Sequence, residues 1–320
     1  MSNHKKISRK IEELFIDNPD TPFDLSWINI VSANQKEIDY LKERFNFSPA
    51  NLEASISTTF SQRPMIFEEN GYLFMILHFP IFENNRIIPA EIEFFVGHGF
   101  LITVHNNNIP TIEKFFNYCK ESQNSLLSYS NESSVMLLYE ILDRLMKDCY
   151  PLIDQNSVKI DEIEDQIFSR TQKKAAEEML SVKRNIISLR KILQNHKNIL
   201  KRLTEMRSSI VERELIKKHY DILVEHSKRI WEMLDIQKDT IEALHDTNES
   251  LLNNRMNEIM RTLTIFSVLM LPLTLVTGIF GMNTPDMPIV GYPHGFWIII
   301  SIMTISLIAL MYVFKRNKWL

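Results

Sequence analysis

The feature that most constrains this chain is a pair of long uncharged apolar runs near its C-terminal end, Leu263–Phe280 and Phe296–Phe314. Each run is long enough, at about 1.5 Å per helical residue, to cross the roughly 30 Å hydrocarbon core of a bilayer. The sequence therefore predicts a two-pass membrane hairpin with spans at about 262–281 and 296–314. The alternative is a buried helical hairpin in a soluble protein, which two uncharged runs of this length disfavour.

Charges beside the two runs predict how the hairpin is oriented. Cations flank the runs on their outer sides, at Arg255, Arg261, Lys315, Arg316 and Lys318, whereas the connecting loop carries one charged residue, Asp286. By the positive-inside rule, both termini are predicted to be cytoplasmic and the loop to face outward. We expect a multi-pass protein of the plasma membrane, of the bacterial inner-membrane type.

The residues before the hairpin predict two further parts, a mixed domain over 1–130 and helical arms with a stalk over 131–261, ahead of the hairpin at 262–320. Strand and helix patterns alternate in the first part, which predicts a cytoplasmic α/β domain. The whole is predicted to be an α+β membrane protein. The expected elements are a helix in 1–20, a strand at 27–31, a helix at 35–45, hairpins over 64–82 and 87–104, and a helix at 111–120.

From Ser133 onward the pattern becomes helical, and no glycine appears until Gly278. Two arms are predicted at about 133–170 and 172–208, with a break near Pro151, and a last helix from about Val211 into the first span. That helix carries an a/d-like seam, which predicts either packing on the neighbouring arm or contact with copies of itself around a central passage. The seam comprises Tyr220, Leu223, Ser227, Ile230, Leu234, Gln237, Ile241, Leu244, Asn248 and Leu251.

One face of the first span carries polar and small residues at steps of three or four. Such a stripe is typical of helix packing in membranes, or of a wall facing a water-filled bore in which apolar side chains form constrictions. One hairpin cannot enclose a path, so conduction would require an oligomer. The candidate pore-lining residues are Asn257, Met260, Leu263, Thr264, Ser267, Leu271, Thr274 and Gly278.

The loop after the first span begins with Gly281-Met282-Asn283. The Asn283 amide oxygen and the Gly281 carbonyl, which no side chain covers, are neutral acceptors. Magnesium sheds its water reluctantly, and a ring of such oxygens can hold the hydrated ion through its water shell. These three residues are therefore the candidate selectivity filter.

The order of these parts resembles the CorA family of divalent-cation channels, with its cytoplasmic domain, long stalk helix, two C-terminal spans and Gly-Met-Asn motif. The resemblance extends to 257–260, 270–274, 278–283 and the basic ending 315–320, and upstream to 62–64 and 183–185. It implies a homopentameric funnel whose first span lines the pore. It also implies an outer selectivity ring at Gly281 and Asn283, a cytoplasmic mouth at Asn257, and constrictions at Met260, Leu263 and Leu271.

The sequence departs from that family at the carboxylates that bind regulatory magnesium between subunits. The family's Leu-Glu-Asp reads Leu52-Glu53-Ala54 here, and its stalk carboxylate falls on Ile222. Glu53 and the neighbouring Asp221 are the candidate substitutes. Met282 favours magnesium over the zinc branch, which often has isoleucine there. We therefore expect magnesium uptake, with a zinc or cobalt transporter, with or without proton coupling, as the alternative.

Functions of other classes have less support. One alternative is a membrane-anchored oligomeric scaffold, in which the spans only hold the protein in the bilayer. The chain shows no nucleotide loop, catalytic triad or His/Cys metal cluster, so no enzyme and no cofactor are expected. The net charge of -4 argues against nucleic acid as a partner. The expected partners are the transported Mg²⁺ (or Zn²⁺ or Co²⁺), the lipid bilayer and further copies of the chain.

Overall fold

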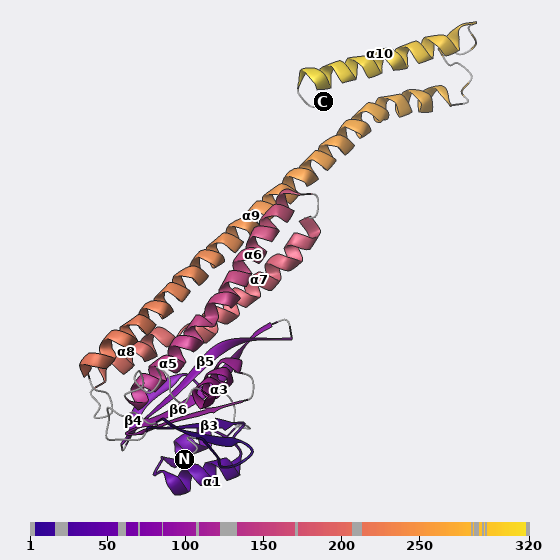
Figure 1. Ribbon diagram of the computed structural model, residues 1–320. Coiled ribbons are helices and arrows are strands. Elements are labelled where there is room, and N and C mark those ends of the chain that lie inside the picture. Colours follow the sequence, from indigo (N-terminus) through magenta and orange to yellow (C-terminus); the bar gives the residue numbers. More distant parts are fainter. Residues whose placement is uncertain are drawn as a thin grey trace. The chain divides into compact units, whose positions relative to one another are not determined.

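The chain divides into two compact units, Met1–Leu244 and His245–Leu320. The helix α9, Arg213–Phe280, begins in the first unit and ends in the second (Figure 1). The computed structural model describes residues 4–16, 25–56, 62–69, 71–84, 86–106, 109–121, 133–169, 172–206, 213–282, 284, 288–289, 291 and 293–317.

A seven-stranded sheet forms the base of the first unit, with the strand order β1-β2-β3-β7-β6-β5-β4. Among the described strands, β3 and β7 pair in parallel and every other neighbouring pair is antiparallel. The strands are β1 His4–Lys6, β2 Ile11–Ile16, β3 Leu25–Val31, β4 Met65–Glu69, β5 Tyr72–Glu83, β6 Arg86–Gly97 and β7 Phe100–His105.

Both predicted hairpins are confirmed, and glycine explains their turns. The β4–β5 connection passes through Gly71 at φ +84°, and the β6–β7 connection through Gly99 at φ +74°. Both values lie in the left-handed region that glycine adopts without steric cost. Asn70, the predicted partner of Gly71 in the first turn, lies outside the described residues.

The predicted helix in residues 1–20 is wrong, because this segment supplies β1 and β2. The apolar residues of β2 face both sides of the sheet, and each side is covered, so the strand lacks a simple alternation of polar and apolar residues. Ile11 packs on one side, whereas Leu14 and Ile16 pack on the other. Pairing with β1 and with the next strand, β3, decides the conformation, and the spacing of apolar residues within the segment does not show those partners.

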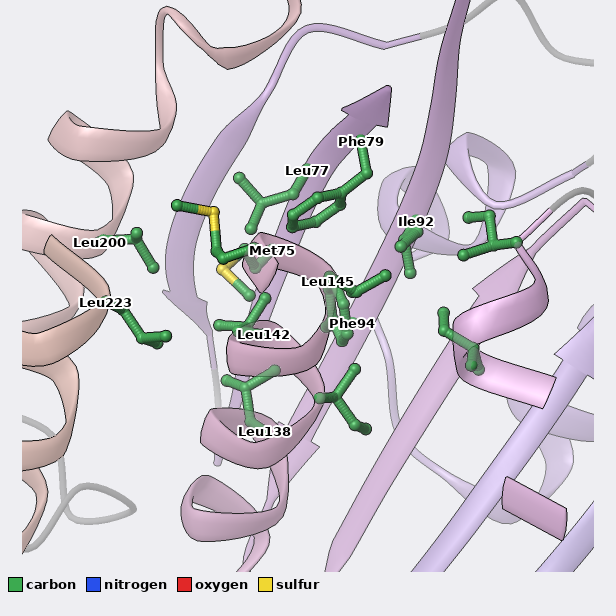
Figure 2. Close-up of a cluster of buried hydrophobic side chains, with 14 of the residues drawn as sticks. Met75, Leu77, Phe79, Ile92, Phe94, Leu138, Leu142, Leu145, Leu200 and Leu223 are labelled. Atoms are coloured by element: carbon green, nitrogen blue, oxygen red, sulfur yellow. The ribbon is translucent and has the colours of Figure 1, made fainter. Parts of the chain in front are cut away.

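Helices cover the two faces of the sheet. The short helices α1, Gln35–Arg44, and α2, Pro49–Ala54, lie on one face, where Ile38, Leu41 and Leu52 enter a small aromatic-rich core. On the other face lie α3, Pro110–Glu121, and α5, Ser134–Lys147. Figure 2 shows side chains of β5 and β6 meeting leucines from α5, α8 and α9 in this larger core. The predicted helices at 35–45 and 111–120 are confirmed.

The helical arms continue from this larger core. They comprise α6, Cys149–Phe168, α7, Gln172–Leu193, and α8, His196–Glu205. The predicted break near Pro151 falls at Asp148, which places the proline in the first turn of α6. A second break at 194–195, between α7 and α8, was not predicted.

The seam of α9 packs on the arms of its own chain. Tyr220 and Gln237 are buried, and they donate hydrogen bonds to the Val135 carbonyl (2.8 Å) and the Ile153 carbonyl (2.7 Å). These carbonyls belong to α5 and α6, which lie beside α9 in the first unit (Figure 1). The packing alternative is therefore confirmed over Tyr220–Leu244. The alternative in which this seam meets copies around a passage is wrong there.

The second unit contains the rest of α9 and the helix α10, Gly295–Arg316. Both helices are long and apolar enough to cross a membrane, and their apolar stretches are almost wholly exposed in the single chain. A core helix of a soluble protein would be buried instead. The exposure therefore argues against the soluble-hairpin alternative and supports two membrane spans.

Candidate ion-conduction path

The predicted stripe lies on one continuous stretch of α9, and every member of it is exposed in the single chain. Steps of three and four residues keep seven of its members along one face, and Leu263 lies beside them. The stripe contains no charged side chain. Its exposed residues are Asn257, Met260, Leu263, Thr264, Ser267, Leu271, Thr274 and Gly278.

Two threonine hydroxyls of this stripe donate to their own helix. Thr264 Oγ1 lies 2.8 Å from the Met260 carbonyl oxygen, and Thr274 Oγ1 lies 2.9 Å from the Met270 carbonyl oxygen. Because each hydroxyl has a single hydrogen, its oxygen is left with lone pairs that can accept from outside the helix. The stripe thus presents neutral acceptors, which suit the hydrogens of water around a cation.

The apolar members of the stripe are long side chains that are largely exposed in the described part of the chain. Met260, Leu263 and Leu271 are 59%, 66% and 69% exposed. Arranged around an axis, rings of such side chains narrow a bore and can close it by excluding water.

Pro272 lies inside α9 and cannot donate to the Val268 carbonyl one turn before it. The hydroxyl of Thr274 does not replace that donor, because its hydrogen goes to Met270. The helix nevertheless continues to Phe280.

The end of α9 sets the geometry of the candidate filter. Gly281 donates its N–H to the Thr277 carbonyl at 2.9 Å, and Met282 donates to the Ile279 carbonyl at 3.2 Å. A Cβ atom on Gly281 would lie 2.9 Å from the Thr277 carbonyl oxygen, closer than real Cβ contacts allow. Gly281 is therefore required by space, and Met282 is exposed. Asn283, the third member of the predicted filter, lies outside the described residues.

The sequence interpretation overlooked Thr277, whose carbonyl holds the last turn together and faces the position of the missing Cβ. Its hydroxyl also donates to the Thr274 carbonyl at 2.9 Å. The available signal was its position four residues before Gly281, where an α-helical hydrogen-bond acceptor falls.

The candidate regulatory pair is not brought together within the chain. Glu53 is exposed on α2, whose Leu52 joins the core on one face of the sheet. Asp221 is exposed on α9, and its neighbours Tyr220 and Leu223 join the core on the opposite face. Within the part of the chain that the structure describes, three or more His, Cys, Asp or Glu residues nowhere form a group that could hold a metal.

Known proteins resemble this chain along nearly its whole length. The family model described as CorA-like Mg2+ transporter protein matches residues 24–316. The cobalt/magnesium transport protein CorA of Thermotoga maritima is 24% identical over 301 residues, which cover 92% of this chain and 83% of that protein. The protein of the same name from Methanocaldococcus jannaschii is 21% identical over 314 residues, or 98% of this chain and 96% of that one.

Solved structures share the fold. The complete structure of the CorA magnesium transporter from Methanocaldococcus jannaschii matches with a TM-score of 0.84 at 19% identity, covering 98% of this chain and 100% of that chain. The full-length CmaX protein matches with a TM-score of 0.75 at 18% identity, covering 94% of this chain and 90% of that one.

These matches confirm the resemblance drawn from the sequence, and they agree with the long stalk helix and the two apolar C-terminal helices. They are ion transporters, not enzymes. The chain belongs to the CorA-like Mg2+ transporter family, a family of divalent-cation transporters of membranes.

Proposed function

We propose that this protein is a channel for magnesium uptake, in which several copies of α9 surround a pore with the stripe from Asn257 to Gly278 as its wall. The observation that carries this proposal is the stripe itself: neutral oxygens and apolar side chains share one exposed face of a membrane helix. Within the described part of a single chain that face is exposed, and around a water-filled axis its polar groups would bind water.

The chemistry of the wall suits a hydrated divalent cation. Magnesium keeps its waters, and those waters donate hydrogen bonds to acceptors. The outward lone pairs of Thr264 and Thr274 and the Gly281 carbonyl accept such bonds without stripping the ion, and the wall carries no cation that would attract anions. Asn283, directly after Met282, completes the outer ring by its amide oxygen.

The assembly that this requires is a homopentamer in our proposal, by analogy with the family. The plasma membrane, with both termini in the cytoplasm, is the location that the flanking charges favour. No nucleotide site is needed, because a dication gains about 4–5 kcal/mol on entering a cell held at about 100 mV inside negative.

A regulatory ion at Glu53 and Asp221 would have to be shared by two chains. The two carboxylates belong to helices on opposite faces of one sheet, so a single subunit cannot supply both to one ion. The second ligand must then come from a neighbouring copy, which is consistent with a sensor that reports on assembly geometry.

The proposal is tested by ion flux into liposomes that contain the purified protein. Magnesium, cobalt and zinc are compared with and without a pH gradient, in the wild type and in Asn283→Ala. The variant is expected to assemble normally and to lose magnesium flux, whereas Asn317→Ala, a matched change at the end of α10, keeps it. Normal magnesium flux through an assembled Asn283→Ala protein would refute the filter. Faster zinc flux, driven by the pH gradient, would favour the alternative cargo.

A further inference from the structure

Two carboxyl groups of β6 lie on the side of the sheet that carries the small aromatic-rich core. The side chains of Ile92 and Phe94 point into the larger core on the other side (Figure 2). Alternate side chains of a strand face opposite sides, so Glu91 and Glu93 face the side that α1 and α2 cover. Glu93 is 5% exposed there, and a carboxyl group so deeply buried needs either a partner or a bound proton.

The register of the sheet places Glu93 in a row of apolar side chains. Its direct neighbours are Ile76 on β5 and Val104 on β7, which both belong to the small core. The same row continues to Met65 on β4 and Ile30 on β3. None of these four side chains is charged or carries a hydrogen-bond donor, so the row itself does not stabilise a negative charge on Glu93.

The polar partner of Glu93 is Glu91, two residues earlier on the same side of β6. Glu91 Oε2 accepts from the Gln62 backbone N–H at 2.8 Å, and His78 Nε2 lies 2.8 Å from the same oxygen. An ionised carboxylate can only accept, so His78 donates through Nε2–H, while its own carbonyl accepts from His196 Nε2 of α8 at 2.7 Å. Glu93 and Glu91 also share a hydrogen bond, which requires a proton on one of them. The proton belongs on Glu93, because Glu91 already accepts from two donors.

Burial raises the pKa of Glu93 well above the ordinary value of 4.5, and the hydrogen bond with Glu91 and the negative charge of Glu91 raise it further. The neighbouring segments carry Arg63, just before β4, and Glu53, on α2, and both side chains are exposed. Glu93 therefore keeps its proton at pH values where an exposed glutamate has lost it.

We infer that Glu93, Glu91 and His78 form a proton-dependent latch, which holds Gln62 and the edge strand β4 that follows it on the sheet. With the proton in place, Glu93 donates to Glu91, and Glu91 keeps both of its other donors. When the proton leaves, two carboxylates meet beside apolar side chains and repel each other.

The repulsion is relieved at Glu91, because the two carboxyl groups differ in what surrounds them. Glu93 lies in a row that other strands flank on both sides, whereas the side chain of Glu91 is 16% exposed and can turn toward water. Turning Glu91 outward breaks its hydrogen bond with the Gln62 N–H. Gln62 leads into β4, which is the last strand of the sheet, so this edge loosens first. The inference concerns the first unit alone and does not depend on ion conduction.

The direction of the pH effect follows from the state that holds the proton more tightly. The folded chain holds the proton of Glu93 more tightly than the unfolded chain, in which this residue is an ordinary glutamate. The contribution of the latch to stability is therefore full below about pH 4.5, and it is lost as the pH rises through the folded-state pKa of Glu93.

The test is hydrogen–deuterium exchange of the full-length protein in detergent, read by mass spectrometry at pH 5 and pH 9. Wild type is compared with Glu93→Gln, whose amide has the shape of the protonated acid, donates to Glu91 and cannot ionise. Peptides that cover 62–69 should exchange at similar rates in the two proteins at pH 5. At pH 9 they should exchange about tenfold or more faster in the wild type, since tenfold corresponds to one pKa unit. Comparing two proteins at one pH cancels the intrinsic pH dependence of exchange.

Two further variants make the result decisive. Glu83→Gln changes an exposed glutamate at the end of β5 and should behave as the wild type does. Glu93→Met suits the apolar row and cannot titrate, so it replaces Glu93→Gln if the glutamine variant does not fold. The ratio of the wild-type exchange rate to the Glu93→Met rate should then rise about tenfold from pH 5 to pH 9.

Two outcomes would overturn the inference. The first is a ratio of exchange rates between wild type and the Glu93 variants, over 62–69, that is the same at pH 5 and pH 9. The second is an acceleration at pH 9 that is equally large in peptides of α6 and α7, which would assign the pH effect to the whole first unit and not to the latch.

Discussion

Replacing Arg44 with alanine should destabilise the first unit by leaving a buried carboxylate without its counter-charge. Arg44 Nη1 donates to Glu13 Oε2 at 2.8 Å, and Nη2 donates to Oε1, which also accepts from Ser26 Oγ at 2.7 Å. The Glu13 side chain is 1% exposed and that of Arg44 is 37% exposed. Breaking a fully buried pair costs about 3–5 kcal/mol, and because water reaches Arg44 we expect about 2–3 kcal/mol here.

The pH dependence of this loss follows from the pKa of Glu13. Burial raises that pKa, but the hydrogen bonds from Arg44 and Ser26 outweigh burial, and the net result is a pKa below the ordinary value of 4.5. A carboxyl with a lowered pKa stabilises the fold above the unfolded-state pKa, and it loses that contribution as the pH falls through the folded-state value. The loss of unfolding free energy caused by Arg44→Ala should therefore have its full value at pH 7 and become smaller below about pH 4.5.

The measurement is urea unfolding of the full-length protein in detergent, followed by tryptophan fluorescence, because Trp27 is buried in this sheet. The double variant Glu13→Leu/Arg44→Met serves as the control, since replacing both partners with apolar groups is often close to neutral. Surface substitutions usually change the free energy of unfolding by less than about 0.5 kcal/mol. If Arg44→Ala changes it by no more than that at pH 7, the reasoning is refuted.

Two further changes probe other parts of the fold. Burial lowers the pKa of His196 to about 4, and its Nε2–H donates to the His78 carbonyl at 2.7 Å. Since the unfolded histidine takes up a proton near pH 6.5, stability should fall by up to about 3 kcal/mol between pH 6.5 and pH 4. His196→Gln should flatten that decline in melting experiments across the same pH range, and an unchanged slope would contradict the assignment. Gly281→Ala should reduce magnesium flux in liposomes without loss of assembly, because the added Cβ meets the Thr277 carbonyl. Magnesium flux at the wild-type level would show that the last turn of α9 shifts to accommodate the added Cβ.

Much of the architecture could be predicted from the sequence where the signal is local. The two spans follow from uncharged length, and the hairpins follow from glycine turns between apolar strands. The order of residues along the stripe also follows from helical spacing alone. Local spacing failed for β2, because its apolar residues are buried on both faces of the sheet and so do not alternate with polar ones.

The sites depend even more on distant partners. The seam of α9 has the spacing of an oligomer interface, and only the contacts of Tyr220 and Gln237 show that it packs on its own arms.

The central claim, that the stripe on α9 faces a conducting pore, is tested most directly by thiol modification of Ser267→Cys during magnesium flux. The native thiols should stay unreactive, because burial raises the pKa of Cys119 to about 12 and also raises the pKa of the buried Cys149. A charged methanethiosulfonate reagent is expected to block flux through Ser267→Cys and to spare Leu269→Cys, which lies about 200° further around the helix. Block through Leu269→Cys with Ser267→Cys unaffected would contradict the account.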